Sequence, residues 1–214
     1  VISGLDYLPD GLLLWRSILQ WLGGIGIIVV AMVFLPELRV GGMQIFKSEG
    51  FDTFGKILPR ATEIAAQVAW LYVGLTGACA VIYIATGMRS FDAVLHAMTT
   101  IATGGFSTYD SSFVKFGAST EYAAVVFMCL AALPFVRYVQ LINGAPGSLF
   151  QDSQVRVFFI VLLVTVGFLT LVLWEGYQFS GELGFRKALF NVVSITTGTG
   201  YASADYSSWG PVAL

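Results

Sequence analysis

Charged residues are scarce in this sequence. Asp, Glu, Lys and Arg together make up 11% of its 214 residues, whereas apolar residues make up 57%. An ordinary soluble domain carries about 25% charged residues. The scarcity of charge therefore excludes a typical soluble domain, and a mean hydropathy of +0.79 indicates a membrane protein.

An excess of positive charge is also missing. The sequence has 11 Lys and Arg residues against 13 Asp and Glu residues, which gives a net charge of −2. No basic stripe exists to neutralise phosphates, which argues against a nucleic-acid partner. Only two cysteines are present, Cys79 and Cys129, and each lies inside an apolar stretch. We expect both cysteines to serve as small buried apolar residues rather than to form a disulfide or a metal site.

Four apolar stretches are long enough to cross a bilayer, whose core of roughly 30 Å needs about 20 residues of helix. They are Leu12–Leu35, Ile64–Thr86, Tyr122–Ile142 and Val157–Trp174. The third contains Arg137 near its end, and we expect this side chain to reach the cytoplasmic interface rather than to act in gating or partner docking. The sequence thus predicts a multi-pass, all-α membrane protein.

A repeat lies between these stretches. Phe91–Phe113 reads FDAVLHAMTTIATGGFSTYDSSF, and Phe185–Trp209, about 94 residues later, reads FRKALFNVVSITTGTGYASADYSSW. Each copy has a short helical stretch, a Thr/Gly run and a tail of Ser, Asp and aromatic residues. We call residues 102–107 the first loop and residues 196–201 the second loop. In this register, His96 of the first copy lies opposite Phe190 of the second.

The helical part of each copy is too short to cross a membrane. Phe91–Ile101 has 11 residues, about 16 Å of helix, so the chain reaches halfway and returns. Irregular backbone at that depth must be buried in protein or line a water-filled cavity.

The ends of these short helices and the Thr/Gly runs suit a cation. A helix C-terminus directed at the bilayer centre carries partial negative charge, which favours a cation there. Glycines allow successive carbonyls to face one axis, as in potassium filters. Neither Thr/Gly run contains a carboxylate, which argues against an acidic ring.

Two other functions fit parts of this pattern. A secondary transporter can hold its substrate at interrupted helices near the midplane, so that function stays open. An intramembrane serine hydrolase would need His96 to pair with a serine such as Ser107, but the second copy has no histidine. We therefore expect His96 to be a packed, hydrogen-bonded residue rather than a ligand or a proton relay.

The two loops resemble the filter loops of the Trk/Ktr/HKT potassium-transporter superfamily, and are most similar to bacterial Trk-type membrane subunits. The resemblance extends to WLGGIGIIVVAMVFLP at 21–36 and to the tails YDSS and YSSW. It implies tandem helix–pore-loop–helix units with re-entrant half-helices, four of which surround one pseudo-fourfold pore. On this basis we expect the chain to be an internal fragment of a longer protein.

The resemblance also implies a division of the chain. Residues 1–36 end a first unit with its inner helix, and 64–142 form a complete second unit. Residues 157–214 form a third unit, truncated after its pore loop. Residues 37–63 and 143–156 are cytoplasmic connectors. Lys and Arg number six in 37–63 and 137–156, against four in the segments that hold the repeats, or five with Arg16; this weak bias places the loops and residues 1–11 outside.

The implied function is potassium uptake across the plasma membrane, the bacterial inner membrane, through a backbone-carbonyl selectivity filter. Potassium is the transported ion, and neither a cofactor nor enzyme activity is implied. A sodium-permeable or poorly selective transporter of the same superfamily remains an alternative. The expected filter residues are Ala102, Thr103, Gly104, Gly105, Thr196, Thr197, Gly198 and Thr199, with Gly104 and Gly198 as the key glycines. Asp110 and Asp205 are expected in the outer vestibule.

The resemblance finally implies partners besides the lipid bilayer. Full-length subunits are expected to form a homodimer. In the family, such cytoplasmic faces dock a nucleotide-binding regulatory subunit, which is therefore a further candidate partner. For the basic stretch 39–62, we expect a solvated connector, with docking of such a subunit as the alternative.

Overall fold

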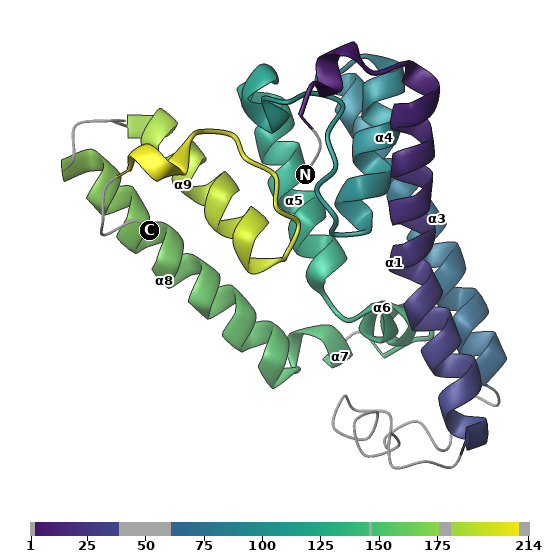
Figure 1. Ribbon diagram of the computed structural model, residues 1–214. Helices are drawn as coiled ribbons and strands as arrows, with labels where there is room; N and C mark the ends of the chain where they lie inside the picture. Colours follow the sequence, from purple (N-terminus) through teal and green to yellow (C-terminus); the bar gives the residue numbers. More distant parts are fainter. Residues whose placement is uncertain (1–2, 39–60, 146, 176–180, 210–214) are drawn as a thin grey trace.

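A computed structural model describes residues 3–38, 61–145, 147–175 and 181–209 (Figure 1). Every regular element in these ranges is helical, which confirms the predicted all-α class. The α-helices are α1 (Asp10–Leu38), α3 (Ala61–Ala85), α4 (Ser90–Ile101), α5 (Ala118–Ala132), α6 (Phe135–Ile142), α7 (Gly147–Phe150), α8 (Ser153–Glu175) and α9 (Gly181–Thr196). Three 3-10 turns are also present: Leu5–Tyr7, Ser112–Lys115 and Tyr206–Ser208.

The long helices coincide with three of the four predicted spans. Within the described residues, Ile64–Ala85 of α3 and Ser153–Trp174 of α8 are each long and apolar enough to cross a membrane. Helix α1 contains the predicted first span and has 29 residues, about 43 Å of helix. Many large apolar side chains of α8 point outward, among them Leu163, Val164 and Leu171. An uncharged exposed face of this kind suits a hydrocarbon surrounding.

The third predicted span is not one straight helix. The chain bends by 86° between α5 and α6, so Tyr122–Ile142 is a bent pair of helices. Leu133, at the end of α5, is extended with φ −76° and ψ 149°, and Pro134 is extended as well. The residue before a proline is driven out of the helical region by the proline ring. The prediction of a single span overlooked this effect.

The two short helices occupy matching places. Helix α4 packs on α3, which precedes it, and on α1 from earlier in the chain. Helix α9 packs in the same way on α8 and on α5 (Figure 1). The repeated sequence therefore forms a repeated packing unit, in which each short helix lies between two longer segments.

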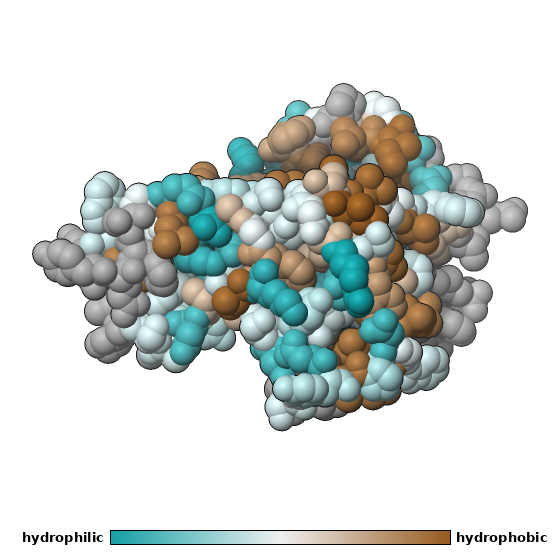
Figure 2. All heavy atoms as spheres, turned by 90° about the horizontal axis from the view of Figure 1, so that it is seen from above, coloured by the Kyte–Doolittle hydropathy of each residue, from teal (hydrophilic) through white to brown (hydrophobic). Residues whose placement is uncertain are grey.

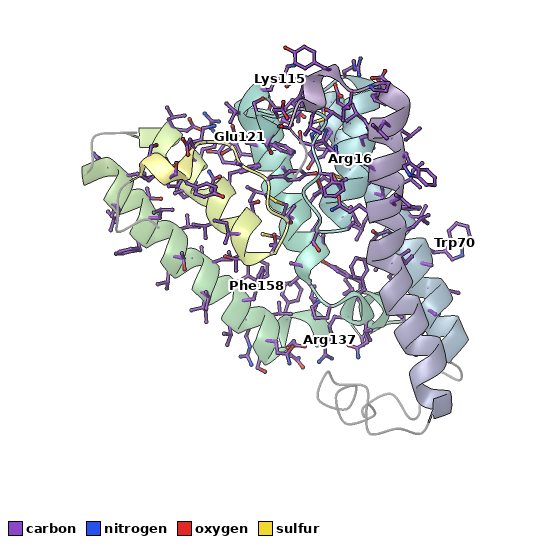
Figure 3. All side chains as sticks on the ribbon, viewed as in Figure 1. Arg16, Trp70, Lys115, Glu121, Arg137 and Phe158 are labelled. Carbon is purple, nitrogen blue, oxygen red and sulfur yellow. The ribbon has the colours of Figure 1, made fainter. Side chains whose placement is uncertain are left out.

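The two ends of the molecule carry different polar groups. Figure 3 shows Lys115 and Glu121 near one end and Arg137 at the other. Figure 2 views the end that carries Lys115 and Glu121, where hydrophilic residues gather among apolar ones. At the opposite end, Arg137 Nε lies 2.7 Å from Asp152 Oδ2, and the Asp152 side chain is 8% exposed. Arg137 thus has an ion-pair partner within the protein.

Some predictions fall outside the described residues. They are the bulk of the 37–63 connector, including most of the basic stretch 39–62, and the chain beyond residue 209. Cys79 and Cys129 are described, and both are free thiols, Cys79 buried and Cys129 half-buried.

Candidate functional site

The first loop begins where α4 ends. Thr103 and Gly105 both have positive φ, 49° and 67°. The Thr99 carbonyl accepts the N–H groups of Gly104 at 2.9 Å and Gly105 at 3.4 Å. Thr99 Oγ1 donates to the Phe106 carbonyl at 2.8 Å. The last turn of the helix therefore shapes the loop directly, through both the backbone and the side chain of Thr99.

The second loop repeats this geometry after α9. Gly198 and Gly200 have positive φ, 75° and 83°. The Ser194 carbonyl accepts the Gly200 N–H at 3.1 Å, and Ser194 Oγ donates to the Tyr201 carbonyl at 2.7 Å. Ser194 therefore takes the place of Thr99.

These equivalent bonds set the repeat at 95 residues rather than 94. The helices end in the same register, at Ile101 and Thr196. Thr103 then corresponds to Gly198, and Gly104 corresponds to Thr199. The predicted equivalence of Gly104 and Gly198 is thus wrong by one residue.

The same shift adds a residue to the candidate site. Gly200 is the counterpart of Gly105, and it was missing from the predicted set. The signal that reveals it lies after the Thr/Gly runs, where Gly105-Phe106 matches Gly200-Tyr201 and Asp110 matches Asp205. An alignment on the start of the helices, as made above, hides it.

The two loops are in contact with each other. A Cβ placed on Gly105 would lie 2.0 Å from the Thr199 carbonyl oxygen. The Tyr201 hydroxyl lies 2.5 Å from Thr99 Oγ1 and 3.1 Å from the His96 carbonyl oxygen. The structure therefore brings together the two parts of the predicted site.

A further residue contacts the first loop from α1. Gln20 Nε2 donates to the Gly104 carbonyl at 2.7 Å, and Gln20 Oε1 accepts the Phe106 N–H at 3.4 Å. Its carboxamide thus bridges two backbone groups of the loop. Sequence reasoning singled out no role for Gln20, because residues 84 or more positions apart carry no local pattern.

His96 is fully buried and makes two hydrogen bonds. Its Nδ1 lies 2.8 Å from the Asp92 carbonyl, which can only accept, so Nδ1 carries the proton and Nε2 accepts from Ser107 Oγ at 3.0 Å. In the 95-residue register its counterpart is Asn191, not Phe190. Asn191 Nδ2 donates to the Lys187 carbonyl and to Ser203 Oγ.

The contacts of Asn191 parallel those of the pair formed by His96 and Ser107. An amide cannot act as a base, yet Asn191 joins its helix to the returning chain as His96 does. The contact of His96 with Ser107 therefore holds the chain that follows the loop. His96 is fully buried, and both of its ring nitrogens have partners within the protein.

The two predicted vestibule aspartates are bonded to backbone. Asp110 accepts the N–H groups of Gly4 and Leu5 at 2.9–3.1 Å. Asp205 Oδ1 accepts the Ser207 N–H at 3.1 Å at the start of a 3-10 turn. Both carboxylates therefore order the backbone of the segments that they contact. Within the described part of the chain, no group of three or more His, Cys, Asp and Glu residues is placed to hold a metal ion.

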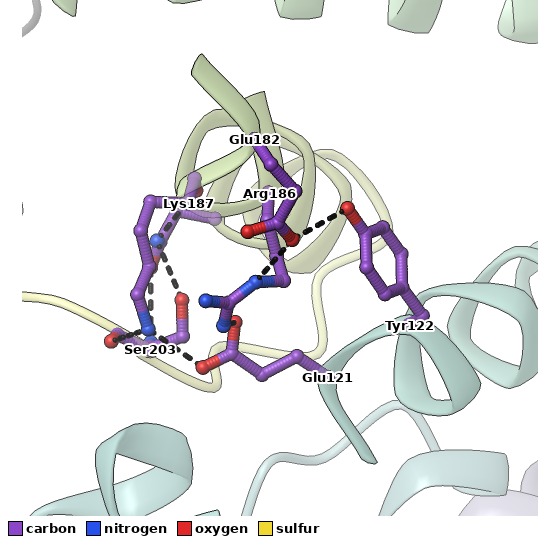
Figure 4. A network of polar contacts seen from close by, with 7 residues as sticks. Glu121, Tyr122, Glu182, Arg186, Lys187 and Ser203 are labelled. Atoms are coloured by element: carbon purple, nitrogen blue, oxygen red, sulfur yellow. Dashed lines mark hydrogen bonds and ion pairs between the residues drawn. The ribbon is translucent and has the colours of Figure 1, made fainter. Parts of the chain in front are cut away.

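A buried charge network joins α5 to the start of α9 (Figure 4). Glu121, 1% exposed, lies 2.6 Å from both Arg186 Nη1 and Lys187 Nζ. Arg186 Nε also binds Glu182 Oε1 at 2.8 Å. Hydrogen bonds from Tyr122 and Arg186 hold the pKa of the Glu182 carboxyl below its usual value.

The arrangement suits a cation. The C-terminal ends of α4 and α9 lead into two touching loops, and helix C-termini carry partial negative charge. The sequence profile of the family described as "TrkH: Cation transport protein" matches residues 1–214. The chain belongs to the TrkH family.

TrkH relatives extend well beyond this chain. It is 42% identical to the Trk system potassium uptake protein TrkI of Halomonas elongata, covering 100% of this chain and 44% of that protein. It is 38% identical to TrkH of Escherichia coli K12, over 97% of this chain and 44% of that protein. These relatives are named as uptake proteins, not as enzymes.

The fold also matches a solved TrkH structure. The crystal structure of the potassium transporter TrkH from Vibrio parahaemolyticus covers the whole chain with a TM-score of 0.84 at 34% identity. This chain covers 44% of that one. The chain thus spans less than half the length of the TrkH proteins that it matches.

Proposed function

We propose that the full-length protein carrying this sequence takes up potassium across the bacterial plasma membrane. The relatives named above are potassium uptake proteins of Trk systems, and this chain shares their family and fold. The proposal needs no cofactor, because it involves no covalent chemistry.

The observation that carries the proposal is the contact between the two loops. Gly105 and the Thr199 carbonyl are neighbours, although they are far apart in sequence. Both loops follow helices that are too short to span, and both begin at a helix C-terminus. Backbone carbonyls in such loops can replace the hydration shell of an ion.

The proposed filter comprises the first loop from Ala102 to Gly105 and the second from Thr197 to Gly200. Thr196, which the sequence analysis included, is the last residue of α9 and corresponds to Ile101. The Gly104 carbonyl would have to contribute to the ion path beside its bond to Gln20. A carbonyl oxygen has two lone pairs, so it can accept the hydrogen bond from Gln20 and face an ion at the same time.

Partners belong to the proposal as well. We expect a homodimer of full-length subunits in the bilayer and a cytoplasmic nucleotide-binding regulatory subunit. Neither involves the loops themselves.

Complementation tests the function. The full-length protein is expressed in a bacterial strain that lacks its own potassium uptake systems, and growth and rubidium uptake are measured at low external potassium. We expect rubidium uptake that is blocked by excess potassium but not by the same concentration of sodium. Equal block by both ions would favour the poorly selective alternative, and the absence of any cation uptake would refute the proposal.

A further inference from the structure

Ser203 lies just after the second loop, and all its polar atoms are bonded. Its carbonyl accepts from Lys187 Nζ at 2.8 Å. Its hydroxyl accepts from Asn191 Nδ2 at 3.1 Å, and its N–H donates to Asn191 Oδ1 at 3.3 Å. Ser203 is 1% exposed. Lys187 and Asn191 of α9 therefore fix the chain that returns from the second loop.

Lys187 is in turn held by a different helix. Its ammonium group lies 2.6 Å from Glu121 Oε1, on the first turn of α5. Figure 4 shows Lys187 between Glu121 and Ser203. The Lys187 side chain is 12% exposed and Glu121 is 1% exposed, so water does little to screen the pair. A continuous chain of contacts thus runs from α5 through Lys187 to the carbonyl of Ser203.

The first copy of the repeat has the opposite charge at this place. In the 95-residue register, Lys187 corresponds to Asp92 and Ser203 to Thr108. Asp92 Oδ1 accepts from Thr108 Oγ1 at 2.9 Å, and Arg89, not a carboxylate, lies beside it at 3.2 Å. In each copy, a side chain on the first turns of the short helix therefore binds the chain that returns from the loop. Only in the second copy is that side chain positive, and there Glu121 balances the charge of Lys187.

We propose that Glu121 is a positioning residue for the second loop, which it controls through Lys187 and the Ser203 carbonyl. Ion discrimination by the transporter then depends on Glu121, although this residue does not touch the loop. The inference rests on the proposed potassium function. Helix α5 then contributes to ion selectivity through Glu121, in addition to packing against α9.

The chain offers a matched control for a change at Glu121. Asp152 is also a buried carboxylate in an ion pair, with Arg137, but it lies at the opposite end of the molecule. Glu121→Gln and Asp152→Asn are both isosteric and both remove one buried negative charge. Only the first alters a group in contact with Lys187.

The test compares potassium and sodium uptake in the full-length protein. We expect Glu121→Gln and Lys187→Met to lower the ratio of potassium to sodium uptake about tenfold, equivalent to about 1.4 kcal/mol. Asp152→Asn should leave the ratio unchanged. An equal fall in the ratio for Asp152→Asn would overturn the inference, because the effect would then reflect general destabilisation.

A double variant guards against misfolding. Glu121→Gln together with Lys187→Met leaves no unpaired charge in the network, since Arg186 keeps Glu182. This variant should fold, as judged by size-exclusion chromatography in detergent, and should still lose discrimination. Wild-type selectivity in the folded double variant would overturn the inference. A wild-type protein that transports no potassium would instead refute the proposed function.

Discussion

Two neighbouring glycines of the first loop have different surroundings. Gly105 has a φ of +67°, and its α-carbon faces the Thr199 carbonyl. Gly104 has an ordinary φ, and a Cβ there would meet the side chain of Gln20. A backbone oxygen of the other loop cannot move aside as a flexible side chain can. The two positions should therefore tolerate substitution very differently.

Gly105→Ala should be the more damaging change. The left-handed conformation alone costs alanine about 1–2 kcal/mol, and the overlap with the Thr199 oxygen adds to it. Gly104→Ala should cost less, because only Gln20 has to shift. Thermal unfolding in detergent measures both variants. Gly87→Ala is the control for backbone strain, because Gly87 has a φ of +99° but open space around it. Equal losses for Gly105→Ala and Gly87→Ala would contradict the close contact of the loops.

The Tyr201 hydroxyl joins the second loop to α4. Tyr201→Phe should destabilise the protein by about 1–2 kcal/mol, because the buried Thr99 hydroxyl and His96 carbonyl lose a partner. It should also weaken the preference for potassium, since Thr99 shapes the first loop. The matched control is Tyr138→Phe, which removes a similar phenol hydroxyl that donates to Leu130 O far from the loops. That variant should lose stability and keep its ion preference, and a change of preference in both would argue against a specific coupling.

Among the elements, the long apolar helices and the short repeated helices could be predicted, because both depend on local composition. Phe91–Ile101 matches α4 within one residue. The bend at Leu133 was missed, although Pro134 marks it, because the apolar run continues through it without interruption. The register of the repeat was also missed, because two glycine-rich runs align almost equally well in either frame. The residues after the runs, Gly105-Phe106 against Gly200-Tyr201, favour the 95-residue frame, and the hydrogen bonds of Thr99 and Ser194 establish it.

Asp152 stabilises two elements at the end of the molecule that carries Arg137. Its Oδ1 accepts the Gln154 N–H at 2.8 Å at the start of α8, and its Oδ2 binds Arg137 of α6. Asp152→Ala should therefore cost about 2 kcal/mol, of which the lost cap supplies about half. Asp152→Asn should cost less, because asparagine caps a helix as well as aspartate does. Chemical or thermal unfolding in detergent ranks the two variants, and an equal cost would exclude a capping role.

The same residue links stability to pH. Burial alone would raise the pKa of Asp152, but the bonds from Gln154 and Arg137 outweigh it and lower the pKa. A lowered carboxyl pKa contributes stability above the ordinary pKa of aspartate, and this stability disappears as the pH falls through the lower, folded value. The difference between wild type and Asp152→Asn should accordingly vanish in acid.

At the scale of the whole molecule, the predicted sidedness can be tested with two exposed serines. Ser119 lies at the start of α5 and Ser153 at the start of α8, at opposite ends of the molecule. In a protein with Cys79 and Cys129 replaced by alanine, a membrane-impermeant maleimide should label Ser119→Cys in intact spheroplasts. Ser153→Cys should react only after permeabilisation. The reverse pattern would invert the assigned topology.

The packing of the short helices has a consequence for how the protein is made. The helices on which α4 packs most extensively, α3 and α1, precede it in the chain, and the same is true of α9 with α8 and α5. A short helix cannot remain in the hydrocarbon layer alone, since the backbone groups at its ends need partners there. During synthesis from the N-terminus, these partners leave the ribosome first and are already in the membrane when the short helix emerges. The order of the segments along the chain thus supplies each half-spanning helix with a place to dock at the moment of its insertion.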